Sequence, residues 1–187
     1  IAQAKQHVCV CSFLLADAQV EDALIAATDR GVRVYLLTSA EMKLKTREGA
    51  DWGRDDEIRP LHNTLLERLS GNVYLRSSGH FHAKYIVADG VHGIMTTCNF
   101  TTKALLENPE LGVRLNQTES QQVWKLFQYQ FWEGSEKEML QKGTLDGVQP
   151  QRRFVDHQPD YPVRCSFNTG KPSLLLKECL DMIQNAE

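Results

Sequence analysis

Residues 7–38 read HVCVCSFLLADAQVEDALIAATDRGVRVYLLT, and this stretch predicts a strand, a helix and a second strand in succession. Apolar residues dominate 7–14 in an alternating pattern, and 32–38 is rich in β-branched and aromatic residues, as strands are. Asp17 is suited to cap the start of the intervening helix, and Gly31 to end it. Such a unit predicts a β-sheet with helices packed on it.

The next hundred residues continue this alternation. We expect a helix over 58–69 and strands over 73–76, 82–89, 92–98 and 111–115. A capping box over Thr118–Gln121 predicts the start of a helix whose aromatic stripe is typical of a protein core. A polar loop over 43–56, which carries Trp52, is either a solvated loop or a border of a substrate cleft. The predicted fold class is α/β, with a mixed β-sheet sandwiched between helices on both faces.

The domain organisation changes after Gly134. Residues 135–162 are polar and charged without a regular period, which predicts a linker. Apolar character returns from 163 onward, with a helix expected over 173–187, and Ile183–Glu187 resembles the opening Ile1–Lys5 at two positions. We therefore expect one unit over 1–134 and the truncated start of a second repeat over 163–187. Because the chain opens on Ile rather than Met, we expect that it was processed or belongs to a longer protein.

Composition excludes several classes of protein. The 187 residues are 42% apolar, which is enough to build a core. The formal charge of −3 argues against a strongly basic nucleic-acid module. The chain also lacks a run of about 20 apolar residues, so no integral membrane segment is expected. The five cysteines fit small buried side chains in a reducing, cytoplasmic compartment; the alternative, a zinc site at Cys9 and Cys11, lacks a second cysteine pair.

The stretch HAKYIVAD, residues 82–89, carries the chemistry. Side chains two positions apart on a strand face the same way, so His82 and Lys84 would project together. A neighbouring cation favours the neutral, nucleophilic imidazole, and a lysine can neutralise an anionic centre while the histidine attacks it. The first alternative to a catalytic pair is that His82 is an ordinary core histidine. The neighbouring Lys84 disfavours this alternative, because a lysine is almost never fully buried without a partner. The second is a zinc site at His80 and His82, which lacks a third ligand.

The spacing of His82, Lys84 and Asp89 resembles the H-x-K-x4-D signature of the phospholipase D superfamily. Downstream, TTCN at 96–99 lies where that family usually has G-S-x-N, and 100–110 is similar to the family's run toward a second Asn and a Glu. Thr replaces the usual Gly at 96 and the frequent Ser at 97, which we expect to alter the pocket more than the chemistry. Over residues 1–134 the resemblance implies a phospholipase D-like fold, one repeat of a normally two-repeat or dimeric architecture.

The resemblance also implies roles for individual residues. His82 would attack phosphorus to form a phosphohistidine, or act as acid and base for a second histidine. Lys84 would hold a non-bridging phosphate oxygen, and Asn99 would donate a hydrogen bond to the same group. Glu110 would accept from the far nitrogen of His82, and Asp89 would be structural. Taken alone, Asn99 could instead cap a turn and Glu110 could be an ordinary surface carboxylate. The resemblance implies no metal and no cofactor.

The expected function is hydrolysis or transfer at a phosphodiester, of the phosphatidyl-transferase type. The active site would be completed by a second His-x-Lys pair, either from a second repeat in a longer chain or from a homodimer mate. The phosphodiester substrate could be a lipid or a nucleic acid. The alternatives are a nuclease or DNA-end phosphodiesterase of the same superfamily and a non-catalytic phosphate-binding module. The acidic net charge argues against a nuclease, and no basic amphipathic stretch supports a lipid.

Overall fold

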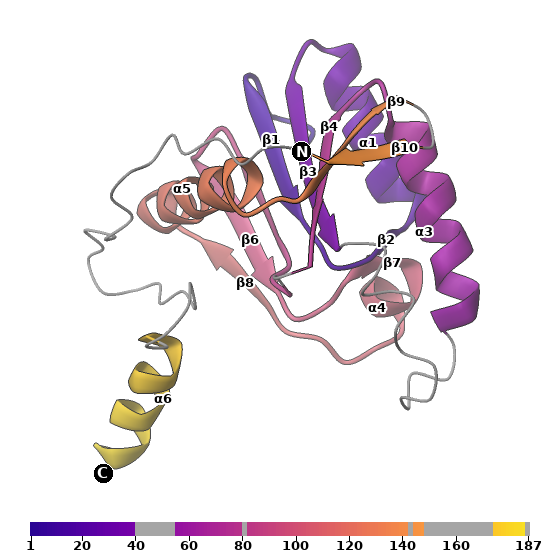
Figure 1. The fold of residues 1–187 in the computed structure, drawn as a ribbon. Coiled ribbons are helices and arrows are strands. Elements are labelled where there is room, and N and C mark those ends of the chain that lie inside the picture. Colours follow the sequence, from indigo (N-terminus) through magenta and orange to yellow (C-terminus); the bar gives the residue numbers. More distant parts are fainter. Residues whose placement is uncertain (40–54, 80–81, 142–143, 148–173, 186–187) are drawn as a thin grey trace. The chain divides into compact units, whose positions relative to one another are not determined.

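The computed structural model of the chain describes residues 1–39, 55–79, 82–141, 144–147 and 174–185. Its main sheet contains β1 (His7–Cys11), β3 (Arg33–Ser39), β4 (Tyr74–Ser78), β5 (Tyr85–Ala88), β6 (His92–Thr96), β8 (Gly112–Leu115), β9 (Lys137–Gln141) and β10 (Thr144–Gly147). The spatial order is β10-β9-β4-β3-β1-β5-β6-β8 (Figure 1). Strands β1, β3 and β4 run parallel, and the other neighbouring strands are antiparallel, so the predicted mixed sheet is confirmed.

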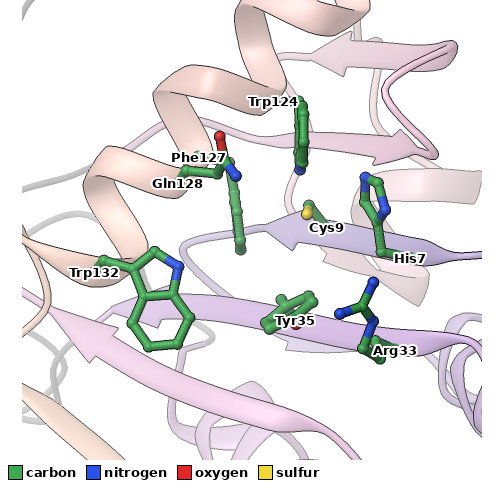
Figure 2. A pocket seen from close by; sticks show the side chains of 8 residues that line it. All are labelled: His7, Cys9, Arg33, Tyr35, Trp124, Phe127, Gln128 and Trp132. Atoms are coloured by element: carbon green, nitrogen blue, oxygen red, sulfur yellow. The ribbon is translucent and has the colours of Figure 1, made fainter. Parts of the chain in front are cut away.

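Helices cover both faces of this sheet. They are α1 (Ala18–Asp29), α3 (Asp55–Leu69), the short α4 (Thr102–Leu106) and α5 (Gln117–Trp132). Helices α1 and α3 lie on one face and α5 on the other (Figure 1). Side chains of a strand alternate between faces. In β1, therefore, Val8 and Val10 join the core under α1 and α3, whereas His7 and Cys9 point toward α5 (Figure 2).

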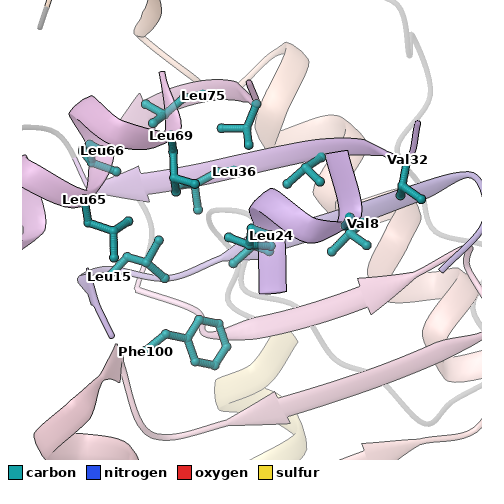
Figure 3. Packing of buried hydrophobic residues seen from close by; sticks show 14 of the residues in the cluster. Val8, Leu15, Leu24, Val32, Leu36, Leu65, Leu66, Leu69, Leu75 and Phe100 are labelled. Carbon is teal, nitrogen blue, oxygen red and sulfur yellow. The ribbon is translucent and has the colours of Figure 1, made fainter. Parts of the chain in front are cut away.

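The larger core lies between the sheet and helices α1 and α3. Leu24 of α1, Leu69 of α3 and Leu36 of β3 are fully buried there (Figure 3). The capping residue predicted for α1 is confirmed, because the side chain of Asp17 accepts from Val20 N at 3.0 Å. The predicted stop is confirmed as well. Gly31, which follows the helix, has a φ of +80°, a conformation that costs glycine little.

A two-stranded parallel sheet connects this core to the end of β1. It pairs β2 (Leu15–Ala16) with β7 (Phe100–Thr101). Thr101 caps α4 by accepting from Ala104 N at 3.3 Å, and Thr102 donates to the α1 cap, Asp17, at 2.8 Å. This small sheet therefore brings residues near position 100 to the carboxyl end of β1.

Four predicted strands are shorter than expected, those over 7–14, 82–89, 92–98 and 111–115. The strand predicted over 7–14 ends at Cys11; Ser12 N still donates to Leu37 O of β3 at 3.1 Å, while the Ser12 hydroxyl donates to Leu14 O of the loop that follows. The strand predicted over 82–89 is β5, Tyr85–Ala88, so His82 and Lys84 precede it. Lys84 still takes part in pairing, since its carbonyl accepts from Thr96 N at 2.9 Å.

The capping box of α5 is formed two residues earlier than predicted. The side chain of Asn116 accepts from Glu119 N at 3.0 Å, and the Glu119 carboxylate accepts from Asn116 N at 2.8 Å. Thr118–Gln121 therefore lies inside the helix instead of starting it. Asparagine caps as well as serine or threonine, and the two registers compete in the sequence Asn-Gln-Thr-Glu.

The sheet continues beyond Gly134, where the sequence predicted a linker over 135–162. Strand β9 pairs with β4, and β10 pairs with β9. The buried Arg76 of β4 explains the attachment, because its guanidinium donates to Phe131 O at 2.9 Å and lies 3.5 Å from the Glu138 carboxylate of β9. The prediction therefore differs from the structure over 137–141 and 144–147, and residues 148–162 of the predicted linker lie outside the described residues.

The chain divides into two units, Ile1–Val155 and Asp156–Glu187. In the second unit, α6 (Leu174–Gln184) confirms the helix predicted over 173–187. Of the loop predicted over 43–56, residues 43–54, including Trp52, lie outside the described residues, as does His80, whereas Asp55 and Asp56 belong to α3. Within the described ranges, no helix is long and apolar enough to span a bilayer.

Candidate functional site

His82 and Lys84 lie side by side at the entrance to β5, as the sequence predicted. The Lys84 Nζ atom is 2.8 Å from Nδ1 and 3.1 Å from Nε2 of His82. Lys84 is 5% exposed, whereas His82 is exposed. An ammonium group can only donate, so the imidazole nitrogen that it contacts must carry a lone pair. The arrangement fits a neutral histidine that an incoming group can reach.

The Lys84 ammonium is a buried cation. Burial lowers the pKa of Lys84, and the charge of the Glu110 carboxylate acts in the opposite direction. No carboxylate of the described residues forms an ion pair with Lys84. A buried cation normally requires a counter-ion, so this position favours an anionic ligand.

The loop that follows β1 packs against His82. The ring of Phe13 lies 5.1 Å from that of His82, measured between centroids. The Phe13 carbonyl is held by Ser39 Oγ at 2.8 Å, and Ser12 Oγ accepts from Phe100 N at 3.2 Å. Ser12 and Phe13 were not predicted as site residues. No pattern in the sequence distinguishes them, because the strand predicted over 7–14 includes both, and only the structure ends that strand at Cys11.

Asn99 is held next to this loop by strand β7, which begins at Phe100. Its Oδ1 atom is buried and accepts no hydrogen bond from the described part of the chain. The preceding turn is fixed independently, since Cys98 N donates to Thr96 Oγ1 at 3.1 Å. The fold therefore places the Asn99 amide while leaving its oxygen unpaired within the described residues.

Glu110 is exposed and is held by Thr97. The Thr97 hydroxyl donates to the Glu110 carboxylate and accepts from Leu111 N at 3.0 Å. Thr97 N also donates to Leu111 O at 2.9 Å. The partner predicted for Glu110 was His82; the contact that the structure resolves for this carboxylate is with Thr97. The charge of Glu110 acts on Lys84, so the two groups belong to one site.

Asp89 lies at the far end of β5 from His82, and the four residues between Lys84 and Asp89 are this strand. Its carboxylate accepts from the backbone N–H groups of Lys5, Gln6 and His7 at 2.8, 2.9 and 2.9 Å. Partial burial acts to raise the pKa of Asp89, but these hydrogen bonds outweigh it and hold the pKa below its ordinary value. Asp89 thus ties the start of the chain to the central strands.

The described residues contain no group of three or more side chains suited to hold a metal ion. Cys9, Cys11 and Cys98 are buried thiols. Burial raises the pKa of Cys9 and of Cys11 well above the usual range for a thiol, so both are protonated and poor ligands.

Comparison with known proteins gives a consistent result. Residues 1–132 match the family model described as cardiolipin synthase, PLD-like domain. A search of curated proteins finds no match. Among solved structures, the phospholipase D family member Nuc from Salmonella typhimurium is 22% identical with a TM-score of 0.55, covering 72% of this chain and 82% of Nuc. NucT from Helicobacter pylori is 14% identical with a TM-score of 0.53, covering 72% and 83%. Phosphatidylserine synthase from Haemophilus influenzae is 15% identical with a TM-score of 0.60, covering 79% of this chain and 37% of that protein.

Proposed function

Because the chain belongs to the cardiolipin synthase, PLD-like domain family within the phospholipase D superfamily, we propose that it supplies one half of an active site for hydrolysis or transfer at a phosphodiester. The observation that carries this proposal is the contact between the buried Lys84 ammonium and the imidazole of His82, 2.8 Å at its shortest. It pairs a neutral nucleophile with a cation that has no carboxylate partner in the described part of the chain, which suits a phosphate group.

In the proposed reaction, the Lys84 ammonium transfers its hydrogen bond from the imidazole to a phosphate oxygen. The freed lone pair of His82 then forms a bond to phosphorus while the bond to the leaving oxygen breaks. The leaving oxygen takes a proton from a second histidine. Water or an alcohol then gives its proton back to that histidine and attacks phosphorus, and the nitrogen–phosphorus bond breaks to restore neutral His82.

Other residues stabilise the charges that develop. Lys84 holds a non-bridging oxygen of the phosphate, and the amide of Asn99 donates to the same group. We propose that Glu110, whose carboxylate accepts from the Thr97 hydroxyl, favours the imidazolium form of His82. Asp89 has no part in these steps and acts through the fold.

This reaction needs a second histidine, so the proposal includes a second His-x-Lys pair. A second repeat in a longer chain and the mate in a homodimer are the two possible sources. The substrate class is a phosphodiester of a lipid or a nucleic acid, and the family match is compatible with both.

The test replaces His82 with alanine in the longest natural chain that carries this domain. We expect turnover of a generic phosphodiester, bis(4-nitrophenyl) phosphate, to fall by at least about 10³-fold, because removing a nucleophile leaves only binding and electrostatic catalysis. The matched control is His92→Ala, since His92 is exposed at the start of β6. Unchanged turnover in His82→Ala would refute the mechanism.

A trapping experiment separates the enzyme from a non-catalytic phosphate-binding module. We expect rapid quenching with a phosphorus-labelled phosphodiester to leave covalent label on the unaltered chain and none on His82→Ala. The experiment uses the longest natural chain that carries this domain; if that chain binds the phosphodiester but forms no adduct and releases no product, it is a binding module.

A further inference from the structure

We propose that Phe13 is a positioning residue for His82, and that the dipeptide Ser12–Phe13 fixes the His82 imidazole relative to the Asn99 amide. This inference rests on the phosphodiester chemistry proposed above. His82 and Asn99 come from different segments of the chain, yet both meet the same phosphate group in that reaction. A reacting group that is displaced by about 1 Å can lower the rate about 100-fold, so the reaction requires a fixed distance between the two side chains.

Ser12 ties the backbone beside Asn99 to the end of β1. Ser12 is fully buried, and its N–H donates to Leu37 O of β3 at 3.1 Å. Its hydroxyl donates to Leu14 O and accepts from Phe100 N at 3.2 Å. Because Phe100 directly follows Asn99 in the chain, the Ser12 hydroxyl sets where the backbone of Asn99 lies.

Phe13 is held by its backbone and contacts His82 with its ring. Its carbonyl accepts from Ser39 Oγ at 2.8 Å and from Thr38 Oγ1 at 3.3 Å, and both of these residues are buried at the end of β3. The ring centroids of Phe13 and His82 lie 5.1 Å apart, with the ring planes tilted by 54°. At this separation two rings attract each other. A buried backbone anchor therefore carries an aromatic ring to the exposed imidazole.

The contact with Phe13 suits a step in which His82 exchanges its other partner. The Lys84 ammonium lies 2.8 Å from Nδ1 of His82, and in the proposed reaction this ammonium moves to a phosphate oxygen. Packing of the imidazole against an aromatic ring uses none of its hydrogen-bonding groups. Phe13 therefore limits rotation of the imidazole without occupying the nitrogen that attacks phosphorus.

The kinetic experiment compares Phe13→Ala with the unaltered form of the longest natural chain that carries this domain, with bis(4-nitrophenyl) phosphate as substrate. We expect kcat to fall about 10- to 100-fold, because the imidazole loses the ring that keeps it in line with phosphorus. KM should change by less than about twofold, because Lys84 and Asn99 hold the phosphate in the proposed reaction and are unaltered. Phe13→Tyr keeps the ring and should restore kcat to within about threefold of the unaltered chain.

Tyr74→Ala is the matched control. Tyr74 is an exposed aromatic residue that stacks on Tyr35 with ring centroids 4.9 Å apart. It begins β4, whereas Ser78 at the other end of that strand pairs with Ser39 beside the site. This variant removes a comparable ring contact away from His82, so we expect kcat to stay unchanged.

Ser39→Ala tests whether the anchor acts through Phe13. Loss of the Ser39 hydroxyl leaves the Phe13 carbonyl with Thr38 Oγ1, so we expect a smaller fall in kcat than in Phe13→Ala. Residues that act through one another show non-additive effects. Ser39→Ala should therefore cause no further fall in kcat when it is added to Phe13→Ala.

Proton NMR of the His82 ring gives a measurement that needs no turnover. We expect the carbon-bound imidazole protons, assigned by their loss in His82→Ala, to shift in Phe13→Ala and to stay in place in Tyr74→Ala. Urea unfolding shows which variants are folded. If Phe13→Ala is unfolded, Phe13→Leu takes its place, with an expected fall in kcat of about tenfold.

Unchanged kcat in the folded Phe13 variant overturns the inference, and so do unchanged His82 signals. A loss of kcat/KM that lies entirely in KM also overturns it, because Phe13 would then bind the substrate instead of positioning His82. The failure of the proposed function gives a different result, because the unaltered chain would then show no turnover at all.

Discussion

Replacement of Asp89 measures how much one motif residue contributes to the fold. The carboxylate holds three backbone N–H groups, one on Oδ2 from Lys5 and two on Oδ1 from Gln6 and His7. Each hydrogen bond is worth about 0.5–1.5 kcal/mol. Because Lys5 and Gln6 are exposed and water can replace part of the loss, we expect Asp89→Ala to lower the free energy of unfolding by about 2–3 kcal/mol.

The backbone conformation refines this expectation. Asp89 has a φ of +55°, which asparagine and glycine tolerate better than alanine. Asp89→Asn keeps the oxygen that serves Gln6 and His7 and loses the one that serves Lys5, so we expect a cost of about 1 kcal/mol. Asp89→Gly loses all three bonds but avoids the strain, and should be about 1 kcal/mol more stable than Asp89→Ala.

Urea unfolding of the four chains, followed by circular dichroism at one protein concentration, gives the order of their free energies of unfolding. We expect the free energy of unfolding to decrease from wild type through Asp89→Asn and Asp89→Gly to Asp89→Ala. The pH dependence follows from the lowered pKa: the contribution of the charged group is present above the ordinary value of 3.8 and is lost as the pH falls through the folded-state value. Equal stability of Asp89→Ala and wild type, or of Asn and Ala, would refute the assigned role.

Three further predictions test packing and charge. Arg76→Met should lower the free energy of unfolding by about 2–3 kcal/mol in thermal unfolding, because it leaves the Glu138 carboxylate and the Phe131 carbonyl of α5 without their partner. Glu138→Gln should cost about 1 kcal/mol or less. Similar costs for the two variants would contradict this prediction. Gly93→Ala should lower the free energy of unfolding by about 1–3 kcal/mol, because the added Cβ would lie 2.9 Å from Ser120 Oγ on α5. Gly112→Ala should leave the free energy of unfolding nearly unchanged, because the nearest atom to its added Cβ is 3.7 Å away. Lys84→Met should reduce phosphodiester turnover at least about 100-fold, because the phosphate loses a cation that stabilises it. The free energy of unfolding should not fall, because burying the cation itself costs free energy. A lower free energy of unfolding in urea would show that Lys84 has a structural role instead.

Much of the fold could be predicted because its signals are local. The Asp17 cap, the Gly31 stop and the apolar strand runs depend on residues a few positions apart, and the structure confirms them. The position predicted for the α5 cap was wrong by two residues. Asn116 and Thr118 are both residue types that can cap a helix, and only the three-dimensional structure decides which of them does. The extent predicted for β5 was wrong because the bounds of a strand depend on its pairing with neighbouring strands such as β6, and not only on the propensity of its own residues.

The linker prediction shows where local reasoning stops. Residues 137–141 and 144–147 show no regular hydrophobic period, yet they extend the sheet because Arg76, some sixty positions earlier, offers a buried charge to Glu138. In the same way, Thr97 was noted only as a replacement for serine, and its bond to Glu110 depends on a turn that brings positions 97 and 110 together.

The chain's own residues are therefore enough to predict an α/β fold and to predict that His82 lies beside Lys84, because only one residue separates the two in the chain. Tertiary structure alone decides that Lys84 is buried without a carboxylate partner among the described residues, that Asp89 serves the amino terminus, and that His7 and Arg33 share a pocket with α5. These properties depend on which strands become neighbours. That choice is made by the burial of apolar surface over the whole sheet, which no single stretch of sequence contains.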